Sequence, residues 1–265
     1  MSQPLAHPGA EPNPNETTYD YQYRRRLRMP IRLNFEQQSK LAMFRRLADH
    51  LPTLPEGARV LDLGFGLGKM LLWFPKHCEL GGNDLSLFAV EQMRQEAGRR
   101  GYRAFRFERL NLDREPIPWV DGSAEVVVCS HLIEHVADDR QLLEMIRRAL
   151  RPGGHLILMC PINETDRNAN PLHVRRYTEE SLEKLLEDFG FQVIATDKAD
   201  TIYHVFEWIG WPRLPRPLEV LRGKCIAVLG AIAVLIPPIW SLPIWGVPRD
   251  YGVLARLERR PEEHL

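Results

Sequence analysis

The alternation of hydrophobic and polar positions divides the chain into short strands and amphipathic helices. Apolar runs bounded by turn residues predict strands at 59–63, 78–84, 102–107, 124–130, 155–160, 191–196 and 253–257. Apolar residues at helical spacing predict helices at 35–51, 69–74, 85–100, 138–150 and 181–189. Strands that alternate with helices are typical of a parallel sheet covered on both faces. We therefore predict a doubly wound α/β fold.

Composition and charge narrow the class of protein without naming a function. Of the 265 residues 44% are hydrophobic and 26% are charged, as in an ordinary folded protein rather than a fibrous or disordered one. The 35 basic side chains balance the 35 acidic ones, so the formal net charge is zero. A neutral chain has no overall field that would draw it onto a polyanion, and we do not expect nucleic acid as its partner.

The cysteines and the first residues of the sequence suggest where the protein works. Residues 1–16 are polar and lack the apolar segment of a secretory signal. The cysteines are far apart and form no zinc-ribbon spacing; they are Cys78, Cys129, Cys160 and Cys225. We expect a cytoplasmic protein whose cysteines pack as small apolar residues.

Three glycines, Gly64, Gly66 and Gly68, occupy a predicted strand-to-helix turn. Glycine permits positive φ angles there, and it lets a ligand touch the backbone because no Cβ stands between them. Asp84 closes the next strand, where a carboxylate can accept hydrogen bonds from both hydroxyls of a ribose. The same residue, or Ser86, would also suit the N-cap of the following helix. Together the glycine turn and the acid predict a site for a nucleotide-like ligand.

The glycine spacing separates two classes of cofactor. A nicotinamide-dependent dehydrogenase would use G-x-G-x-x-G. Here the spacing is G-x-G-x-G with Asp62 two residues before the first glycine, a form that resembles motif I of class I S-adenosylmethionine-dependent methyltransferases. The resemblance continues in the expected order through Asp84 and the segments 109–113, 118–129, 130–136 and 151–158. It implies a Rossmann-like, mostly parallel sheet with an antiparallel last strand, and S-adenosylmethionine as the cofactor.

The resemblance also implies a role for individual residues toward that cofactor. Asp62 and the backbone of Gly64 and Gly66 would meet its amino-acid part, and Asp84 would bind its ribose. Asn111 and the Leu112 backbone would lie beside its adenine. The Ser130 backbone would lie beside its sulfonium. A shift of the alignment by two residues would put Asp113 in place of Asn111.

The sulfonium is an activated methyl donor, so the protein needs mainly to align the acceptor and, for a hydroxyl acceptor, to remove a proton. His131, His135 and His173 are the candidate catalytic bases, because imidazole titrates near neutral pH. With Glu134 they also resemble the acid-and-histidine cluster with which some members, notably ubiquinone-pathway and small-RNA-end methyltransferases, bind a divalent ion. Those members have an acid where this chain has His131, so we expect no metal.

Two segments outside the predicted core are candidates for contact with the acceptor. Residues 19–28, rich in Tyr and Arg, would either fold over the cofactor or form a solvated arm. After the fifth strand of the core, the segment 173–177 carries arginines that would pair with an anionic acceptor group or with Glu179 and Glu180.

Residues 225–248 carry no charge and contain several prolines, which break a helix before it could span a bilayer. If the last strand is antiparallel, as the resemblance implies, both ends of this insertion return to one sheet, which excludes a single membrane crossing. A membrane-surface contact through 208–248, an oligomer interface and a wall of an acceptor tunnel remain. The oligomeric state is left open.

The predicted division is an N-terminal arm (1–34), a methyltransferase core (35–202), an apolar insertion (203–250) and a last strand with a tail (251–265). The predicted function is methyl transfer from S-adenosylmethionine to a small-molecule or lipid-like acceptor at oxygen, in the cytoplasm or peripherally attached to a membrane. Two alternatives are a catalytically silent methyltransferase-like binding module and an NAD-dependent dehydrogenase.

Overall fold

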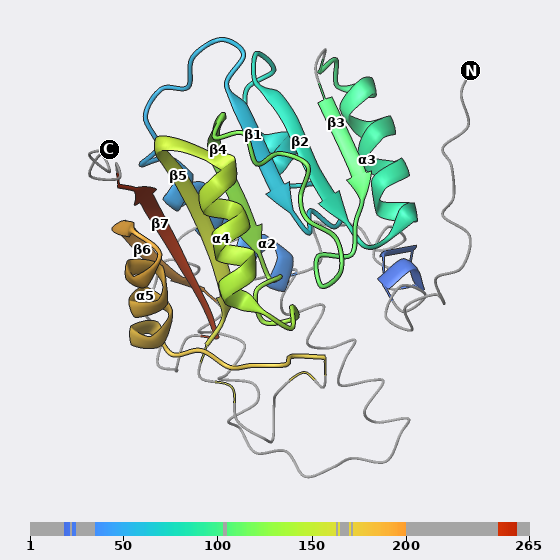
Figure 1. Ribbon diagram of the computed structural model, residues 1–265. Coiled ribbons are helices and arrows are strands. Elements are labelled where there is room, and N and C mark those ends of the chain that lie inside the picture. The colour runs from blue at the N-terminus through green and yellow to red at the C-terminus, as the bar shows by residue number, and fades with distance from the viewer. Residues whose placement is uncertain are drawn as a thin grey trace, which may run out of the picture.

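A single seven-stranded sheet forms the centre of the computed structural model, which describes residues 19–21, 23–24, 35–102, 105–162, 164, 170, 172–199 and 249–258. The strand order is β3-β2-β1-β4-β5-β7-β6 (Figure 1). The strands are β1 (Arg59–Leu63), β2 (Glu79–Asp84), β3 (Phe105–Arg109), β4 (Ala124–Ser130), β5 (Leu150–Pro161), β6 (Phe191–Ala199) and β7 (Asp250–Leu257). Only β7 runs against its neighbours β5 and β6. This confirms the predicted mostly parallel sheet with an antiparallel last strand.

Helices cover both faces of the sheet (Figure 1). They are α2 (Phe35–Ala48), α3 (Leu87–Arg99), α4 (Asp139–Ala149) and α5 (Glu179–Asp188), with a short 3₁₀ turn, η2 (Leu71–Trp73). The apolar sides of α2 and α3 bury one face with residues such as Phe44 and Met93, and α4 and α5 bury the other with residues such as Ile146 and Leu186. The two layers of helix cover both faces of β1 and β4, whose central residues are mostly apolar and buried.

Local sequence signals set most helix starts. Ser86 caps α3, its side chain accepting a hydrogen bond of 3.0 Å from the Ala89 N–H. Asp138 caps α4 in the same way through the Gln141 N–H, and Thr178 forms a capping box with Ser181 at α5. Ser86, and not Asp84, is therefore the N-cap residue of α3, so the Asp84 carboxylate does not serve as the helix cap.

Several predicted boundaries differ from the structure. The fifth predicted strand begins at residue 155, after the turn Arg151-Pro-Gly-Gly154, but β5 begins at Leu150 and runs through that turn. Gly153 supplies a φ of 78°, and the pairing register with β4 shifts between Ala124 and Val126, so the turn is absorbed as an irregularity in the sheet. The helix predicted to begin at Lys69 is only the single turn η2.

The carboxyl ends of β1, β2 and β4 meet at the edge where the strand order reverses between β1 and β4. This is where ligands bind in open α/β sheets. Cys78, Cys129 and Cys160 are free and buried, as predicted. The insertion 203–250 and its membrane, interface and tunnel interpretations lie outside the described residues, apart from Arg249 and Asp250.

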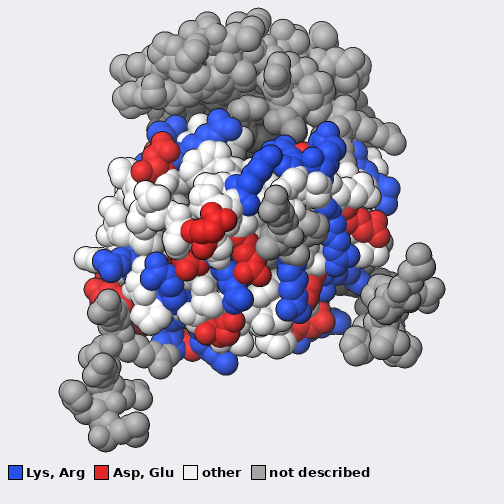
Figure 2. All heavy atoms as spheres, turned by 90° about the horizontal axis from the view of Figure 1, so that it is seen from above, with Lys and Arg blue, Asp and Glu red and all other residues white. Residues whose placement is uncertain are grey.

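No helix among the described residues is long and apolar enough to cross a membrane. Basic and acidic side chains are interspersed over the described surface on the face shown in Figure 2. That face therefore lacks the extended basic field expected of a nucleic-acid interface.

Candidate functional site

The predicted glycine turn borders a cavity of about 430 Å³ at the carboxyl end of β1. Gly64 and Gly66 have φ angles of 70° and 55°, so the positive φ inferred from the sequence is present. The Gly64 N–H donates to the Asn83 carbonyl at 2.8 Å, which fastens the turn to the end of β2. Ser130 and His131 line the same cavity. The sequence-predicted residues 62, 64, 66, 130 and 131 therefore line one space.

Asp84 lies at the floor of the turn, almost completely buried. Its Oδ2 accepts a hydrogen bond of 2.8 Å from the Gly66 N–H, and its Oδ1 accepts one of 2.9 Å from the Ser86 N–H. Burial raises the pKa of Asp84 to about 6 in spite of these two bonds, which lower it. The Oδ1 retains a lone pair for a ribose hydroxyl, and a second ribose hydroxyl would replace the hydrogen bond of 3.4 Å that the Oδ2 accepts from the Tyr23 hydroxyl.

Asp62 is buried beside the same turn, and its Oδ1 has no hydrogen-bond partner. Burial, and then the charge of Asp84, raise the pKa of Asp62 well above its ordinary value. A buried carboxyl oxygen without a partner is costly unless a ligand donates to it. The ammonium group in the amino-acid part of S-adenosylmethionine is such a donor, so these residues fit the predicted cofactor.

A second hollow, of about 120 Å³, continues from Asp84 toward Asn111 and Leu112. The Asn111 Oδ1 accepts a bond of 3.1 Å from the Asp113 N–H, and the Asp113 Oδ1 accepts one of 2.8 Å from the Ala137 N–H. Both side chains thus shape the loop that walls the hollow. Leu112 is buried at its inner end. The predicted adenine contacts, Asn111 and Leu112, thus border one hollow with Asp84, and Asp113 is engaged with the turn that follows β4.

Residues of the N-terminal arm lie over the glycine turn. Tyr19 and Tyr23 line both hollows and stack on each other with their ring centroids 6.3 Å apart. The Tyr23 hydroxyl donates a hydrogen bond of 3.4 Å to the Asp84 Oδ2. The Ser86 hydroxyl donates to Asp20, and the Arg24 guanidinium lies 4.2 Å above the ring of Phe88. Of the two interpretations of the arm, this geometry agrees with the one in which it covers the cofactor.

His131 has a φ of 52°, the only positive value for a non-glycine residue in the described part of the chain. Its Nδ1 lies 3.4 Å from the Glu134 Oε1, close enough to attract the carboxylate although the groups are not aligned for a hydrogen bond. Its Nε2 lies 3.6 Å from the Asp250 Oδ1. A strained backbone and two buried carboxylates thus hold the imidazole at the cavity wall. Sequence reasoning missed Asp250, because only the pairing of β7 with β5 brings it beside residue 161.

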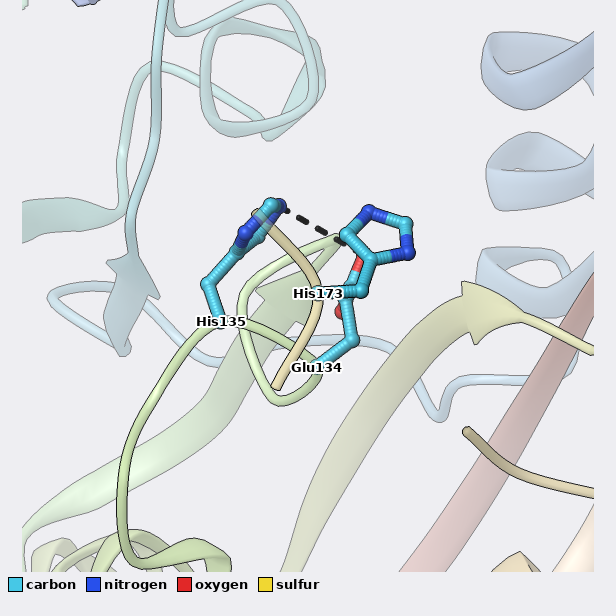
Figure 3. A group of neighbouring side chains, drawn as sticks. All are labelled: Glu134, His135 and His173. Atoms are coloured by element: carbon cyan, nitrogen blue, oxygen red, sulfur yellow. Dashed lines mark ion pairs between the residues drawn. The ribbon is translucent and has the colours of Figure 1, made fainter. Parts of the chain in front are cut away.

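Glu134, His135 and His173 form a second group at the same wall (Figure 3). One ligand-type atom from each lies within 4.8 Å of the other two. Burial alone would raise the pKa of Glu134, but the neighbouring rings of His131 and His135 bring it below its ordinary value overall. Burial lowers the pKa of His135, which favours the neutral ring. The structure therefore places all three predicted histidines in one cavity. His131 lies between Glu134 and Asp250, whereas His135 and His173 lie together beside Glu134.

The segment that carries His173 is fastened to the turn after β4. Arg175 donates to the carbonyls of Val136 and Ala137 at 3.0 and 2.7 Å, and it pairs with Asp139 at 3.5 Å. The Tyr177 hydroxyl donates to Asp139 at 2.9 Å. From the sequence, an arginine of this segment was predicted to pair with the acceptor or with Glu179 and Glu180. For Arg175 the structure shows instead a structural clamp that positions His173.

Residues 35–196 match the family of methyltransferase domains. The chain belongs to this family. A stretch of 88 residues is 39% identical to a protein of Mycolicibacterium smegmatis named as a probable S-adenosylmethionine-dependent methyltransferase, covering 31% of this chain and 34% of the relative. Another of 119 residues is 32% identical to the 27-O-demethylrifamycin SV methyltransferase of Amycolatopsis mediterranei, covering 43% of this chain and 42% of the relative.

The chain spans about a third to a half of the length of the curated relatives it matches. Among solved structures, the cyclase SpnF has a TM-score of 0.58 at 19% identity, with 84% of this chain and 82% of that chain covered. At that identity the likeness concerns the fold alone. Family and fold together confirm the predicted methyltransferase class and its cofactor, S-adenosylmethionine.

Proposed function

We propose that this protein transfers the methyl group of S-adenosylmethionine to a hydroxyl of a small-molecule or lipid-like acceptor. The observation that carries the proposal is the position of His131. Its imidazole is held between Glu134 and Asp250 on the wall of the cavity that Asp62, Gly64 and Ser130 also line. A base that is oriented by further groups is what a hydroxyl acceptor requires.

Bound S-adenosylmethionine supplies an activated methyl group. The residues of the chain supply binding, alignment and proton removal. Asp84 would accept hydrogen bonds from the ribose, and the backbone of Gly64 and Gly66 with Asp62 would hold the amino-acid part. The Ser130 backbone lies at the end of the cavity where the sulfonium would be placed, next to His131. The acceptor hydroxyl approaches from this side, and an imidazole accepts its proton while the stacked tyrosines Tyr19 and Tyr23 restrict the access of water.

The lipid-like character of the acceptor is proposed from the sequence. The uncharged segment 225–248 directly precedes Arg249 and Asp250, and both of these line the cavity. An uncharged segment of this length is the feature of the sequence that favours an apolar acceptor. The proposed cytoplasmic location, with peripheral membrane attachment through 208–248, rests on the same segment.

The experiment is a transfer assay with S-adenosylmethionine labelled in its methyl group and a panel of apolar alcohols, phenols and amines. We expect label in hydroxyl acceptors with the wild type and a loss of about 10²- to 10⁴-fold in kcat with His131→Ala, the range for removal of a general base. Transfer confined to amines would contradict the oxygen assignment. Stoichiometric cofactor binding without transfer to any class would favour the silent binding module.

A further inference from the structure

The cluster of Glu134, His135 and His173 has a feature that the proposed transfer does not use. Both carboxylate oxygens of Glu134 are buried, and neither forms a hydrogen bond. The His135 Nε2 lies 4.0 Å from the Glu134 Oε1, too far for a hydrogen bond. A buried charged carboxylate aimed at imidazole nitrogens without bonding to them is expensive for a folded protein. The imidazoles of His131 and His135 offset part of that cost, and a bound cation would remove the rest.

The far side of each ring is already occupied. The His135 Nδ1 lies 3.1 Å from the Leu172 carbonyl, and the His173 Nδ1 lies 2.7 Å from the Glu164 carboxylate. In each ring this nitrogen carries the proton, because its partner can only accept. The lone pair of a neutral ring is then on Nε2. A carbonyl or a carboxylate behind the ring is the usual support of a metal-binding histidine.

Hydrogen bonds also fix the backbone that carries the cluster. The Val174 N–H donates to the Glu134 carbonyl at 2.9 Å, and the Arg175 clamp holds the next residues. In Figure 3 the two rings stand nearly perpendicular, with the Glu134 carboxylate beside them. Ligand atoms around a tetrahedral ion lie about 3.3 Å apart, as bond lengths of about 2.0–2.1 Å require. The group, at 4.8 Å or less, needs to close by about an ångström or more.

We propose that Glu134, His135 and His173 bind a divalent transition-metal ion, with Glu164 holding the ring of His173. Two imidazoles and one carboxylate suit Zn²⁺, whereas Mg²⁺ prefers oxygen ligands alone. His131 is not a ligand, since it faces Asp250 and Glu134. The sequence had suggested a set of four that included His131 and led us to expect no metal. The structure reduces the set to three and adds the supports behind the rings.

All three ligands line the large cavity beside Ser130, so the open coordination position of the ion faces the acceptor. The role of the ion rests on the proposed function: it would bind the acceptor hydroxyl and lower the pKa of that hydroxyl. The presence of the ion does not rest on the proposed function. Metal binding is therefore measured without cofactor or acceptor.

The full chain is freed of metal with a chelator and titrated with Zn²⁺ against a chromophoric competitor, and with Co²⁺ by visible absorption. We expect one ion per chain and a Co²⁺ spectrum of low coordination number, unaffected by excess Mg²⁺. His173→Ala and the nearly isosteric Glu134→Gln should weaken Zn²⁺ binding by at least about 100-fold. Glu164→Gln should weaken it about 10- to 100-fold, as for a supporting residue.

His77→Ala is the matched control, because it removes one exposed imidazole far from the cavity and should leave Zn²⁺ affinity unchanged. Equal affinity of the wild type and Glu134→Gln, or a Co²⁺ spectrum like that of the free aqueous ion, would overturn the proposal. The Co²⁺ spectrum of the wild type tests the metal site even if a variant does not fold. S-Adenosylhomocysteine binding, measured in the same metal-free samples, separates the claim of a metal site from the claim of a cofactor site. Lost Zn²⁺ binding with intact nucleoside binding refutes only the metal, and the reverse refutes only the cofactor site.

Discussion

The carboxyl of Asp84 makes cofactor affinity depend on pH in a direction that the structure defines. Burial raises the pKa of Asp84 to about 6, and the hydrogen bonds from Ser86 and Gly66 only partly offset this. Ribose hydroxyls donate to the ionised carboxylate and not to the protonated one. With a pKa of about 6 the group is about 9% ionised at about pH 5 and about 91% ionised at about pH 7. Affinity should therefore rise about tenfold across this interval.

The assay is isothermal titration with S-adenosylhomocysteine at several pH values, for the wild type and Asp84→Asn. Asparagine keeps a similar shape and removes the titration, so the step near pH 6 should disappear. At neutral pH the variant should bind about 10- to 100-fold more weakly, which corresponds to one charge-assisted hydrogen bond of about 1.5–3 kcal/mol. Wild-type affinity that is flat or falls between pH 5 and pH 7, or an Asp84→Asn variant that keeps the same step, would refute the reasoning.

The raised pKa of Asp84 affects the stability of the cofactor-free protein in the opposite direction to cofactor affinity. The folded state holds the Asp84 proton more tightly than the unfolded state, whose ordinary value is 3.8. The contribution of this group to stability is therefore present at low pH and is lost as the pH rises through about 6. Cofactor binding and folding thus make opposite demands on one carboxyl, as is common at binding sites.

Three further predictions concern other parts of the site and the fold. Gly82→Ala should destabilise the protein by about 1–3 kcal/mol in urea unfolding. A Cβ there would lie 2.4 Å from the Asp62 carbonyl oxygen and force β1 and β2 apart. An unchanged midpoint of the urea unfolding curve would contradict this. Gly98→Ala, the matched control on α3, meets open space and should stabilise the helix by about 0.5–1 kcal/mol. Asp250→Asn should lower kcat while S-adenosylhomocysteine affinity stays within about twofold, since Asp250 orients His131 and is remote from Asp84; a large loss of nucleoside affinity would argue against that role.

The elements that local pattern determines were predicted well. The strands β1 and β4 agree to the residue, because each is an apolar run between polar turns that pairs on both sides within the sheet. The capped helices α3 and α4 agree within two residues for the same local reason. The proximity of Gly64 and Asp84 could also be predicted, since they follow neighbouring strands whose carboxyl ends meet; their role toward the cofactor stays a prediction.

What failed depends on contacts between distant segments. Asp250 reaches His131 only through the antiparallel pairing of β7 with β5. The support of His173 by Glu164, and the clamp formed by Arg175, depend on how the segment after β5 folds back on the turn after β4. The turn at residues 151–154 was misjudged because Pro and Gly usually end an element, whereas pairing with β4 carries the strand through. No local pattern contains this information.

The most direct test of the central claim is a crystal structure of the chain with S-adenosylhomocysteine. We predict the ribose hydroxyls at the Asp84 carboxylate, the ammonium group at the Asp62 Oδ1, the adenine beside Asn111 and Leu112, and the sulfur facing Ser130 and His131. Nucleoside density elsewhere in the molecule, or with the adenine at His131 and the sulfur at Asn111, would contradict the account.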